Sequence, residues 1–263
     1  MVKYDPHNHK RYYERWKEGG SSLPEISPQN ATIIRRYLED MEIGANVSPS
    51  TKKGSRSYGL LRNLKAKLQT LFMLMEEELG IECVTELYNR DMDILKFFRK
   101  FREGQLRCRR IRCKPLKAIG TYARVFKAFW HWYQREQRKK GETLLDITVD
   151  LDSRDDKPKF NYFTIEQLKE LCNSARYDYR VMMMFLFDSG IRAPTEMMNI
   201  RVKDLEWDDK RNHYILNIRE ETSKTFGRKI KLLLCSDMLK DYITQQKFPV
   251  DQFIFKKSPQ NVN

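Results

Sequence analysis

The spacing of apolar residues changes on either side of one polar, charged segment, Asp146–Phe160, and this change constrains the fold most strongly. Before the segment, apolar residues recur at the spacing of amphipathic helices, whereas after it helical runs are joined by two β-like runs. Pro158 lies in the segment and favours a break in regular structure. We therefore predict two domains, residues 30–145 and 161–263, joined by a linker at residues 146–160. A chain of 263 residues is long enough for both.

The first domain is expected to be a helical bundle. Its most regular stripe runs along Leu60–Leu79, where leucine and phenylalanine recur on one side. The final helix carries an aromatic face that includes Phe126, Phe129 and Trp130. The four expected helices span Ala31–Met41, Leu60–Leu79, Met92–Phe101 and Ala118–Glu136.

The second domain is expected to mix helices with a small antiparallel sheet. Thr164 and Gln167 have the spacing of a capping box, so they open a helix. Two β-like runs flank the polar turn Glu220–Gly227 and predict a hairpin. The remaining expected elements are helices at Tyr179–Asp188, Met197–Ile200 and Asp237–Gln246, hairpin strands at His213–Arg219 and Arg228–Leu234, and a short strand at Phe253–Phe255. The predicted fold class is mainly α.

Residues 1–29 have the composition of an arm. Aromatic and basic side chains alternate there before the Gly19-Gly20-Ser21-Ser22 break. One interpretation is a short tail packed on a neighbouring domain. The other is an arm that contacts DNA or protein, and the sequence does not separate the two.

The formal net charge of +14 points first to a nucleic-acid partner and less often to an anionic membrane surface. No run of 18 apolar residues exists and the first residues lack a secretory signal, so we expect a cytoplasmic, nucleoid-associated protein without a membrane partner. The five cysteines lack Cys-x-x-Cys spacing, which indicates reduced thiols. Even the nearest pair, Cys108 and Cys113, lacks histidines at ligand spacing, so no metal is expected.

The densest basic segment is Lys96–Lys117. It holds ten lysines and arginines and one acidic residue, Glu103. Such a surface suits phosphate neutralisation, although a solvated basic loop has the same composition. The candidate DNA-binding residues are Lys96, Arg99, Arg102, Arg107, Arg109, Arg110, Arg112, Lys114 and Lys117, together with Arg228 in the second domain.

Two motifs in the second domain carry possible chemistry. Arg192 follows a helix that ends at Gly190, where its planar fork is available to a phosphate or to Glu196 as an ion pair. Lys224 lies in the predicted hairpin turn, and taken alone it is a solubilising charge.

The order of these motifs resembles the catalytic domain of tyrosine recombinases, the phage integrase and Xer group. The sequence runs from a helix to Gly-x-Arg-x-x-x-Glu, then to Ile-Arg-Val-Lys-Asp-Leu, then to a hairpin with Ser-Lys-Thr-x-x-Arg. The basic helical domain, which ends in TYARVFKAFWHWYQ, looks like the core-binding domain of that family, with its SAM-like fold. The resemblance covers residues 30–255 and implies a DNA clamp with one domain on each side of a duplex.

The resemblance also implies roles for three residues. Arg192 would contact the scissile phosphate, Lys224 would act as general acid on the leaving 5′ oxygen, and Glu196 would support the arginine. The family's acid stands three residues after its arginine, whereas Glu196 stands four after, which leaves its role open. Fixed cations would stabilise the transition state, so neither a metal nor a nucleotide cofactor is implied.

The family's later elements, a His-x-x-Arg box and the nucleophilic tyrosine, do not follow Lys224 in these 263 residues, where the remaining tyrosine is Tyr242. We expect Tyr242 to be a packing residue and the chain to bind DNA without cleaving it. The chain is interpreted as the DNA-binding portion of a recombinase that is tetrameric on DNA when complete, itself a monomer in solution. The alternatives are a catalytically inactive relative that acts as a regulator, and a helical RNA-binding or scaffold protein.

Overall fold

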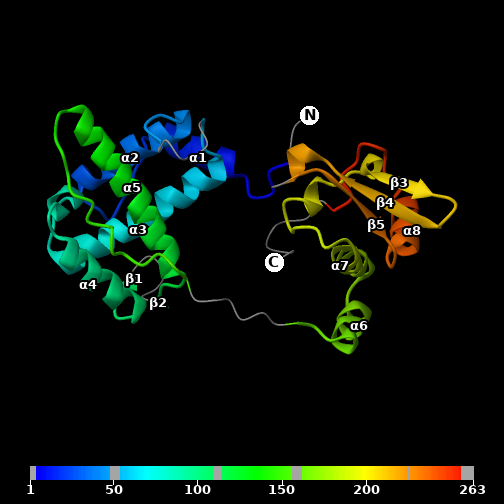
Figure 1. The fold of residues 1–263 in the computed structure, drawn as a ribbon. Helices are drawn as coiled ribbons and strands as arrows, with labels where there is room; N and C mark the ends of the chain where they lie inside the picture. The colour runs from blue at the N-terminus through cyan, green and yellow to red at the C-terminus, as the bar shows by residue number, and fades with distance from the viewer. Residues whose placement is uncertain (1–3, 48–53, 109–113, 156–161, 224–225, 256–263) are drawn as a thin grey trace. The chain divides into compact units, whose positions relative to one another are not determined.

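The computed structural model describes residues 4–47, 54–108, 114–155, 162–223 and 226–255, and it divides the chain into two compact units (Figure 1). The helical unit comprises His9–Pro158. The mixed unit comprises Met1–Asn8 together with Lys159–Asn263, so the first residues of the chain belong with the last part of it. Each unit has its own hydrophobic core.

One long helix, α3, organises the helical unit. It packs against α1, α2, α4 and α5, and ten of its residues are buried. The elements of this unit are α1 (His9–Glu18), α2 (Pro28–Ile43), α3 (Tyr58–Leu79), a 3₁₀ turn at Val84–Leu87, α4 (Asp91–Arg102), strands β1 (Arg107–Cys108) and β2 (Lys114–Pro115), and α5 (Ile119–Lys139). The two short strands pair antiparallel. All four helices that we expected in this region are present, with boundaries that differ by at most three residues.

Local signals explain where the helices begin and end. The Ser27 and Ser57 hydroxyls accept hydrogen bonds from backbone N–H groups in the first turns of α2 and α3. Both helices end at glycines with positive φ, Gly44 at 75° and Gly80 at 62°, a conformation that a side chain disfavours. These caps satisfy groups that a helix leaves unpaired at its ends.

Aromatic rings fill the core of the helical unit. Phe129 of α5 lies with its centroid 5.1 Å from Phe72 of α3 and 5.5 Å from Tyr37 of α2, both in edge contacts. Phe126 and Trp130 are also fully buried, so the aromatic face expected on the last helix packs inward. Large buried rings of this kind supply much of the apolar area that stabilises such a unit.

The mixed unit consists of helices around a three-stranded antiparallel sheet in the order β3-β4-β5. The buried face of the sheet, which includes Leu216, Ile218 and Leu232, belongs to the core that contains α7 and α8. Its elements are α6 (Ile165–Ser174), α7 (Tyr177–Ser189), 3₁₀ turns at Met197–Asn199 (η3) and Val202–Asp204 (η4), β3 (Leu205–Asp208), β4 (His213–Ile218), a 3₁₀ turn at Glu220–Thr222 (η5), β5 (Arg228–Leu232) and α8 (Ser236–Gln246). The mainly α fold class with a small antiparallel sheet is therefore confirmed.

The residues that we expected to form an arm are part of the folded units. His9–Glu18 forms helix α1, whose Tyr13 is buried, and the Trp16 indole donates to the Ser22 carbonyl at 2.7 Å. The expected linker also differs in its described part, because Ile147 and Leu151 are buried in the helical core. The apolar residues of α1 do have helical spacing, but the many charged residues between them hid this pattern, so no helix was expected there.

Three smaller differences concern the mixed unit. Strand β3 was not expected, because a four-residue run that contains two acidic residues carries a weak strand signal. Strand β5 ends at Leu232, since the next two residues turn toward Asp188. Around Phe253 the structure has one isolated bridge, to Arg201, and no strand in the residues described there. Among the described helices, none has the length and apolar character needed to cross a membrane.

Candidate nucleic-acid interface

The turn that presents Arg192 is built where α7 ends. Gly190 has a φ of 59°, and its N–H donates to the Leu186 carbonyl at 3.0 Å, which closes the helix. The chain then folds back on itself, because the Glu196 N–H donates to the Arg192 carbonyl at 3.1 Å. This turn brings the two ends of the Arg192–Glu196 segment together.

Glu196 is the centre of the site. Its Oε1 accepts a hydrogen bond from Arg192 Nη1 at 2.8 Å, and its Oε2 accepts from the Arg192 backbone N–H at 3.1 Å. The four-residue separation that departs from the family pattern therefore permits direct contact. The ion pair that we considered as the alternative for Arg192 is present, and a role toward phosphate stays a prediction.

The hairpin brings a second arginine to the same carboxylate. Arg228, the first residue of β5, donates from Nη2 to Glu196 Oε2 at 2.9 Å. The Ser223 hydroxyl donates to Glu196 Oε1 at 3.3 Å. The fold thus brings two arginines to the buried carboxylate of Glu196. Arg192 lies close to it in the sequence, whereas Arg228 lies 32 residues after it. Lys224 follows Ser223 in the chain and lies outside the described residues.

Burial and charge are distributed unevenly across this cluster. The Glu196 side chain is 2% exposed, whereas those of Arg192 and Arg228 are 51% and 34% exposed. Burial alone would raise the pKa of Glu196, but hydrogen bonds from Arg228 and Arg192 outweigh it and lower the pKa to about 2. The carboxylate is therefore ionised at neutral pH, and two positive charges surround a single negative one. The arginine ends that face solvent remain able to bind an anion.

A second ion pair, between Arg219 and Asp204, lies against η3, and our sequence analysis selected neither residue for the site. Arg219 pairs with the buried carboxylate of Asp204 at 3.0 Å and donates from Nη2 to the Asn199 carbonyl at 2.8 Å. Asp204 also accepts the Arg201 N–H at 2.8 Å, which shapes the turn that follows η3. The Ile-Arg-Val-Lys-Asp-Leu motif contained the signal for Asp204, but nothing in the sequence indicated its partner.

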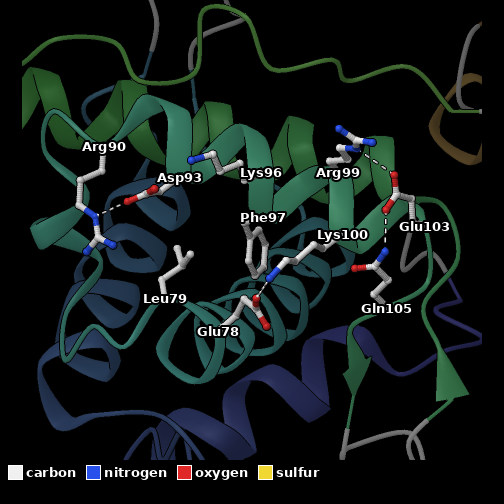
Figure 2. A pocket seen from close by; sticks show the side chains of 10 residues that line it. All are labelled: Glu78, Leu79, Arg90, Asp93, Lys96, Phe97, Arg99, Lys100, Glu103 and Gln105. Atoms are coloured by element: carbon white, nitrogen blue, oxygen red, sulfur yellow. Dashed lines mark hydrogen bonds and ion pairs between the residues drawn. The ribbon is translucent and has the colours of Figure 1, made fainter.

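The basic segment of the helical unit is more neutral than its sequence suggests. Four cations line a hollow of about 510 Å³ beside α4, where Figure 2 shows them interleaved with acidic side chains. Arg99 pairs with Glu103 at 2.9 Å, and Lys100 pairs with Glu78, which comes from α3. A third cation, Arg90, pairs with Asp93 at 2.7 Å. The Lys96–Lys117 segment therefore draws compensating acids from outside its own sequence.

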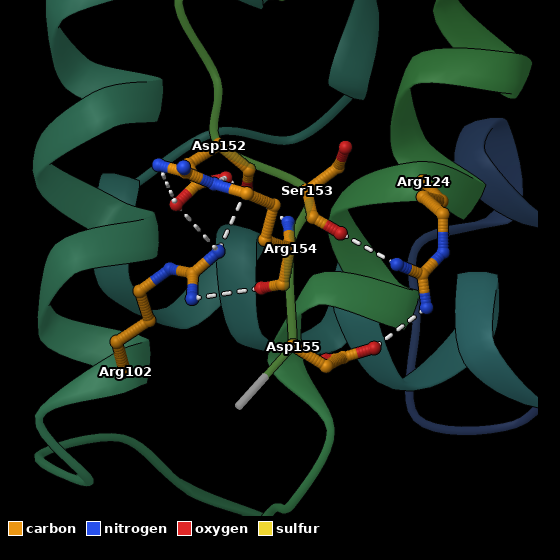
Figure 3. A network of polar contacts seen from close by, with 6 residues as sticks. All are labelled: Arg102, Arg124, Asp152, Ser153, Arg154 and Asp155. Atoms are coloured by element: carbon orange, nitrogen blue, oxygen red, sulfur yellow. Dashed lines mark hydrogen bonds and ion pairs between the residues drawn. The ribbon is translucent and has the colours of Figure 1, made fainter. Parts of the chain in front are cut away.

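Arg102 has a structural contact. Figure 3 shows its guanidinium against the backbone of residues 152–154, where it donates to the Asp152 carbonyl at 2.7 Å and to the Arg154 carbonyl at 3.2 Å. Arg124 of α5 holds the same stretch by donating to the Ser153 carbonyl at 2.5 Å and to the Asp155 carboxylate at 2.6 Å. Both arginines fasten the end of the helical unit, so part of the basic surplus serves folding.

The other candidate DNA-binding residues divide into two groups. Lys96, Arg107 and Lys117 are exposed and have no ion-pair partner among the described residues. Nothing is established for the rest of the segment, because the side chain of Lys114 and the whole of Arg109, Arg110 and Arg112 lie outside the described residues.

Tyr242 lies in a packed position. Its side chain is 7% exposed, and its ring lies 6.0 Å from Tyr177 and 5.6 Å from Phe248 in edge contacts. This agrees with our expectation that Tyr242 is a packing residue. A buried hydroxyl in this position is poorly placed to attack a DNA phosphate.

Comparisons with known proteins add no assignment. No family model matches the chain, and searches of curated proteins and of solved structures return no match to it. The resemblance to tyrosine recombinases therefore depends on the order of the motifs in the sequence.

Proposed function

We propose that this chain binds duplex DNA as the DNA-binding portion of a tyrosine recombinase, with Arg192 and Arg228 engaging a backbone phosphate. The observation that carries the proposal is the shared carboxylate of Glu196, on which both arginines converge while their side chains stay 51% and 34% exposed. Two guanidinium groups held in a fixed relation suit the oxygens of one phosphate.

The arrangement also agrees with the chemistry of the family that the sequence resembles. In a phosphoryl transfer without a metal, negative charge develops on the non-bridging oxygens and is stabilised by fixed donors. A buried anion that positions two arginines reduces the conformational freedom that they lose on binding. The SAM-like character of the helical unit and the role of Lys224 as general acid belong to the same proposal.

The surface of the helical unit would supply sequence-independent affinity. Lys96, Arg107 and Lys117 are the described candidates for phosphate contacts, because they are exposed and have no ion-pair partner among the described residues. Arg102 has a competing structural role, and Arg99 would have to share its charge with Glu103. Contacts of this kind position a protein on DNA without reading its sequence.

A single-charge comparison tests the phosphate role. Arg192→Ala and Arg211→Ala each remove one positive charge from the mixed unit, but Arg211 is exposed and outside the cluster. We expect Arg192→Ala to weaken duplex binding about tenfold in fluorescence anisotropy, as for a lost charge-assisted hydrogen bond, and Arg211→Ala to change it less than about twofold. Equal losses in the two variants would contradict the proposal. So would stronger binding of single-stranded RNA than of duplex DNA, which favours the RNA-binding alternative.

A catalytically inactive DNA-binding regulator is the second candidate, and the burial of Tyr242 favours it for these residues. Incubation with a nicked duplex followed by denaturing gel electrophoresis tests the expectation that the two candidates share, which is that these residues alone do not cleave DNA. We expect the chain to form no covalent adduct with DNA. An adduct that disappears in Tyr242→Phe would refute this expectation, because Tyr242 would then be the nucleophile of an active recombinase.

A further inference from the structure

Residues 4–8 belong to the mixed unit, although the chain continues at His9 into the helical unit. Tyr4 lies against the core of the mixed unit, and the following Pro6 is buried. The segment is thus separated by about 150 residues of sequence from the rest of the unit that it joins. Such a segment is held by specific contacts rather than by its chain neighbours.

The principal contact is made by one side-chain amide. Asn199 Oδ1 accepts the Tyr4 N–H at 2.8 Å, and Asn199 Nδ2 donates to the Tyr4 carbonyl at 2.9 Å. The same Nδ2 donates to the Thr195 carbonyl at 2.8 Å, so the buried amide uses both of its donor hydrogens. An amide paired with the N–H and C=O of one residue recognises extended backbone, in the manner of an added strand.

An aromatic contact adds side-chain selectivity. The Tyr4 ring lies 5.8 Å from the ring of Phe253, and the Arg201 guanidinium lies 4.5 Å from the Phe253 centroid. Asn199 and Phe253 thus form a docking site with a backbone-binding amide and an aromatic ring, which we call the Asn199–Phe253 site. It fits an extended peptide with an aromatic residue beside the amide.

The Asn199–Phe253 site is connected by hydrogen bonds to the turn that carries Glu196. The Asn199 N–H donates to the Glu196 carbonyl at 3.0 Å, and the Asn199 carbonyl accepts from Arg219 at 2.8 Å. A segment that fixes the Asn199 side chain therefore also restrains the turn that carries Glu196. Release of the segment would leave Asn199 Oδ1 without its partner and Nδ2 with the Thr195 carbonyl alone, and this loss would favour a rearranged η3.

We propose that residues 4–8 of this chain occupy the Asn199–Phe253 site, and that their docking stabilises the turn that holds Glu196 between Arg192 and Arg228. The consequence for phosphate binding rests on the proposed function, whereas the docking itself does not. Residues 4–8, which precede the helical unit in the sequence, would thus help to hold the site in place.

Hydrogen exchange tests the docking without DNA. In a chain that lacks residues 1–8, we expect backbone amides at Glu196–Ile200 to exchange about tenfold faster than in the intact chain, because two hydrogen bonds are lost. Amides in α3 should be unchanged, which also shows that the helical unit remains folded. Millimolar peptide of residues 1–8 should restore slow exchange to the shortened chain.

Two point variants of the intact chain separate backbone recognition from ring packing. Tyr4→Ala keeps the N–H that Asn199 accepts, whereas Tyr4→Pro removes it, so the proline variant should exchange faster at Glu196–Ile200. Identical exchange at Glu196–Ile200 in the intact and shortened chains would overturn the proposal. A dimer that requires residues 1–8, detected by light scattering, would also overturn it, because the occupant would then come from a second copy. If duplex binding fails in every chain while exchange behaves as expected, the proposed function fails and the docking stands.

Discussion

Replacing Glu196 by glutamine keeps the size of the side chain and removes its charge. The carboxylate accepts hydrogen bonds from Arg192, Ser223 and Arg228 in a buried position. An amide offers a single acceptor oxygen, and its nitrogen would direct hydrogens at a guanidinium that also donates. We therefore expect Glu196→Gln to destabilise the mixed unit and leave the helical unit unchanged.

The pKa of Glu196 sets the size of this effect. Its fall from the ordinary 4.5 to about 2 corresponds to ~3 kcal/mol of folding free energy at ~1.36 kcal/mol per pH unit. Because both arginines are partly exposed, water replaces some of the lost interaction, and we expect a loss of ~2 kcal/mol. For a unit of this size, that loss lowers the Tm by about 10 °C.

The sign of the pH dependence follows from the direction of the shift. A carboxyl whose pKa is lowered on folding stabilises the folded state fully above its unfolded value of 4.5. That contribution disappears as the pH falls from 4.5 toward about 2, where the folded carboxyl takes up its proton. The stability difference between the wild type and Glu196→Gln should therefore be constant near neutral pH and should narrow below pH 4.5.

Urea unfolding followed by circular dichroism measures this difference. Glu206→Gln is the matched control, because Glu206 lies in the same unit with a side chain that is 69% exposed and a 3.5 Å contact to Lys229. The control should change the free energy of unfolding by less than about 0.5 kcal/mol. Equal effects of the two substitutions, or a Glu196 effect that does not depend on pH, would refute the reasoning.

Three further outcomes are expected. Duplex affinity should fall more than about a hundredfold between about 50 and 200 mM salt, and affinity that stays flat in a titration would exclude a surface of many phosphate contacts. Gly120→Ala should lower the stability of the helical unit by about 1–3 kcal/mol, since its methyl group would lie 2.5 Å from the Arg154 carbonyl oxygen; an unchanged Tm would contradict that close approach. Asp188→Asn should cost about 1–2 kcal/mol, because the carboxylate accepts the N–H groups of Leu233, Leu234 and Cys235; a loss no larger than that of exposed Asp209→Asn would count against this.

Helix positions were predictable because their signals are local. The apolar stripe of α3 and the Thr164–Gln167 capping box each lie within a few turns of chain, and both elements are present. Docking of α1 was not predictable, since it depends on α3 contacts that the local sequence does not encode. Strand β3 similarly exists because β4 pairs with it.

The candidate site shows the same difference between local signals, which the sequence reveals, and contacts between distant segments, which it does not. Arg192, Glu196 and Arg228 could be selected from motif spacing, but their common meeting point required the hairpin to fold back toward the end of α7. Counting acids within Lys96–Lys117 overestimated its free charge, because Glu78 and Asp152 approach it from other segments. Local charge in a sequence therefore predicts a basic surface less well than it predicts a helix.

Strand β5 is held at both ends by acidic side chains, Asp188 and Glu196, which lie eight residues apart in the sequence. Asp188 binds the backbone just beyond β5, and Glu196 binds Arg228 at its start. The strand is thus anchored independently of the loop that precedes it. Under the proposed function, the part of that loop outside Ser223 and Lys224 is a place where contacts with DNA can be changed while Arg228 stays beside Glu196.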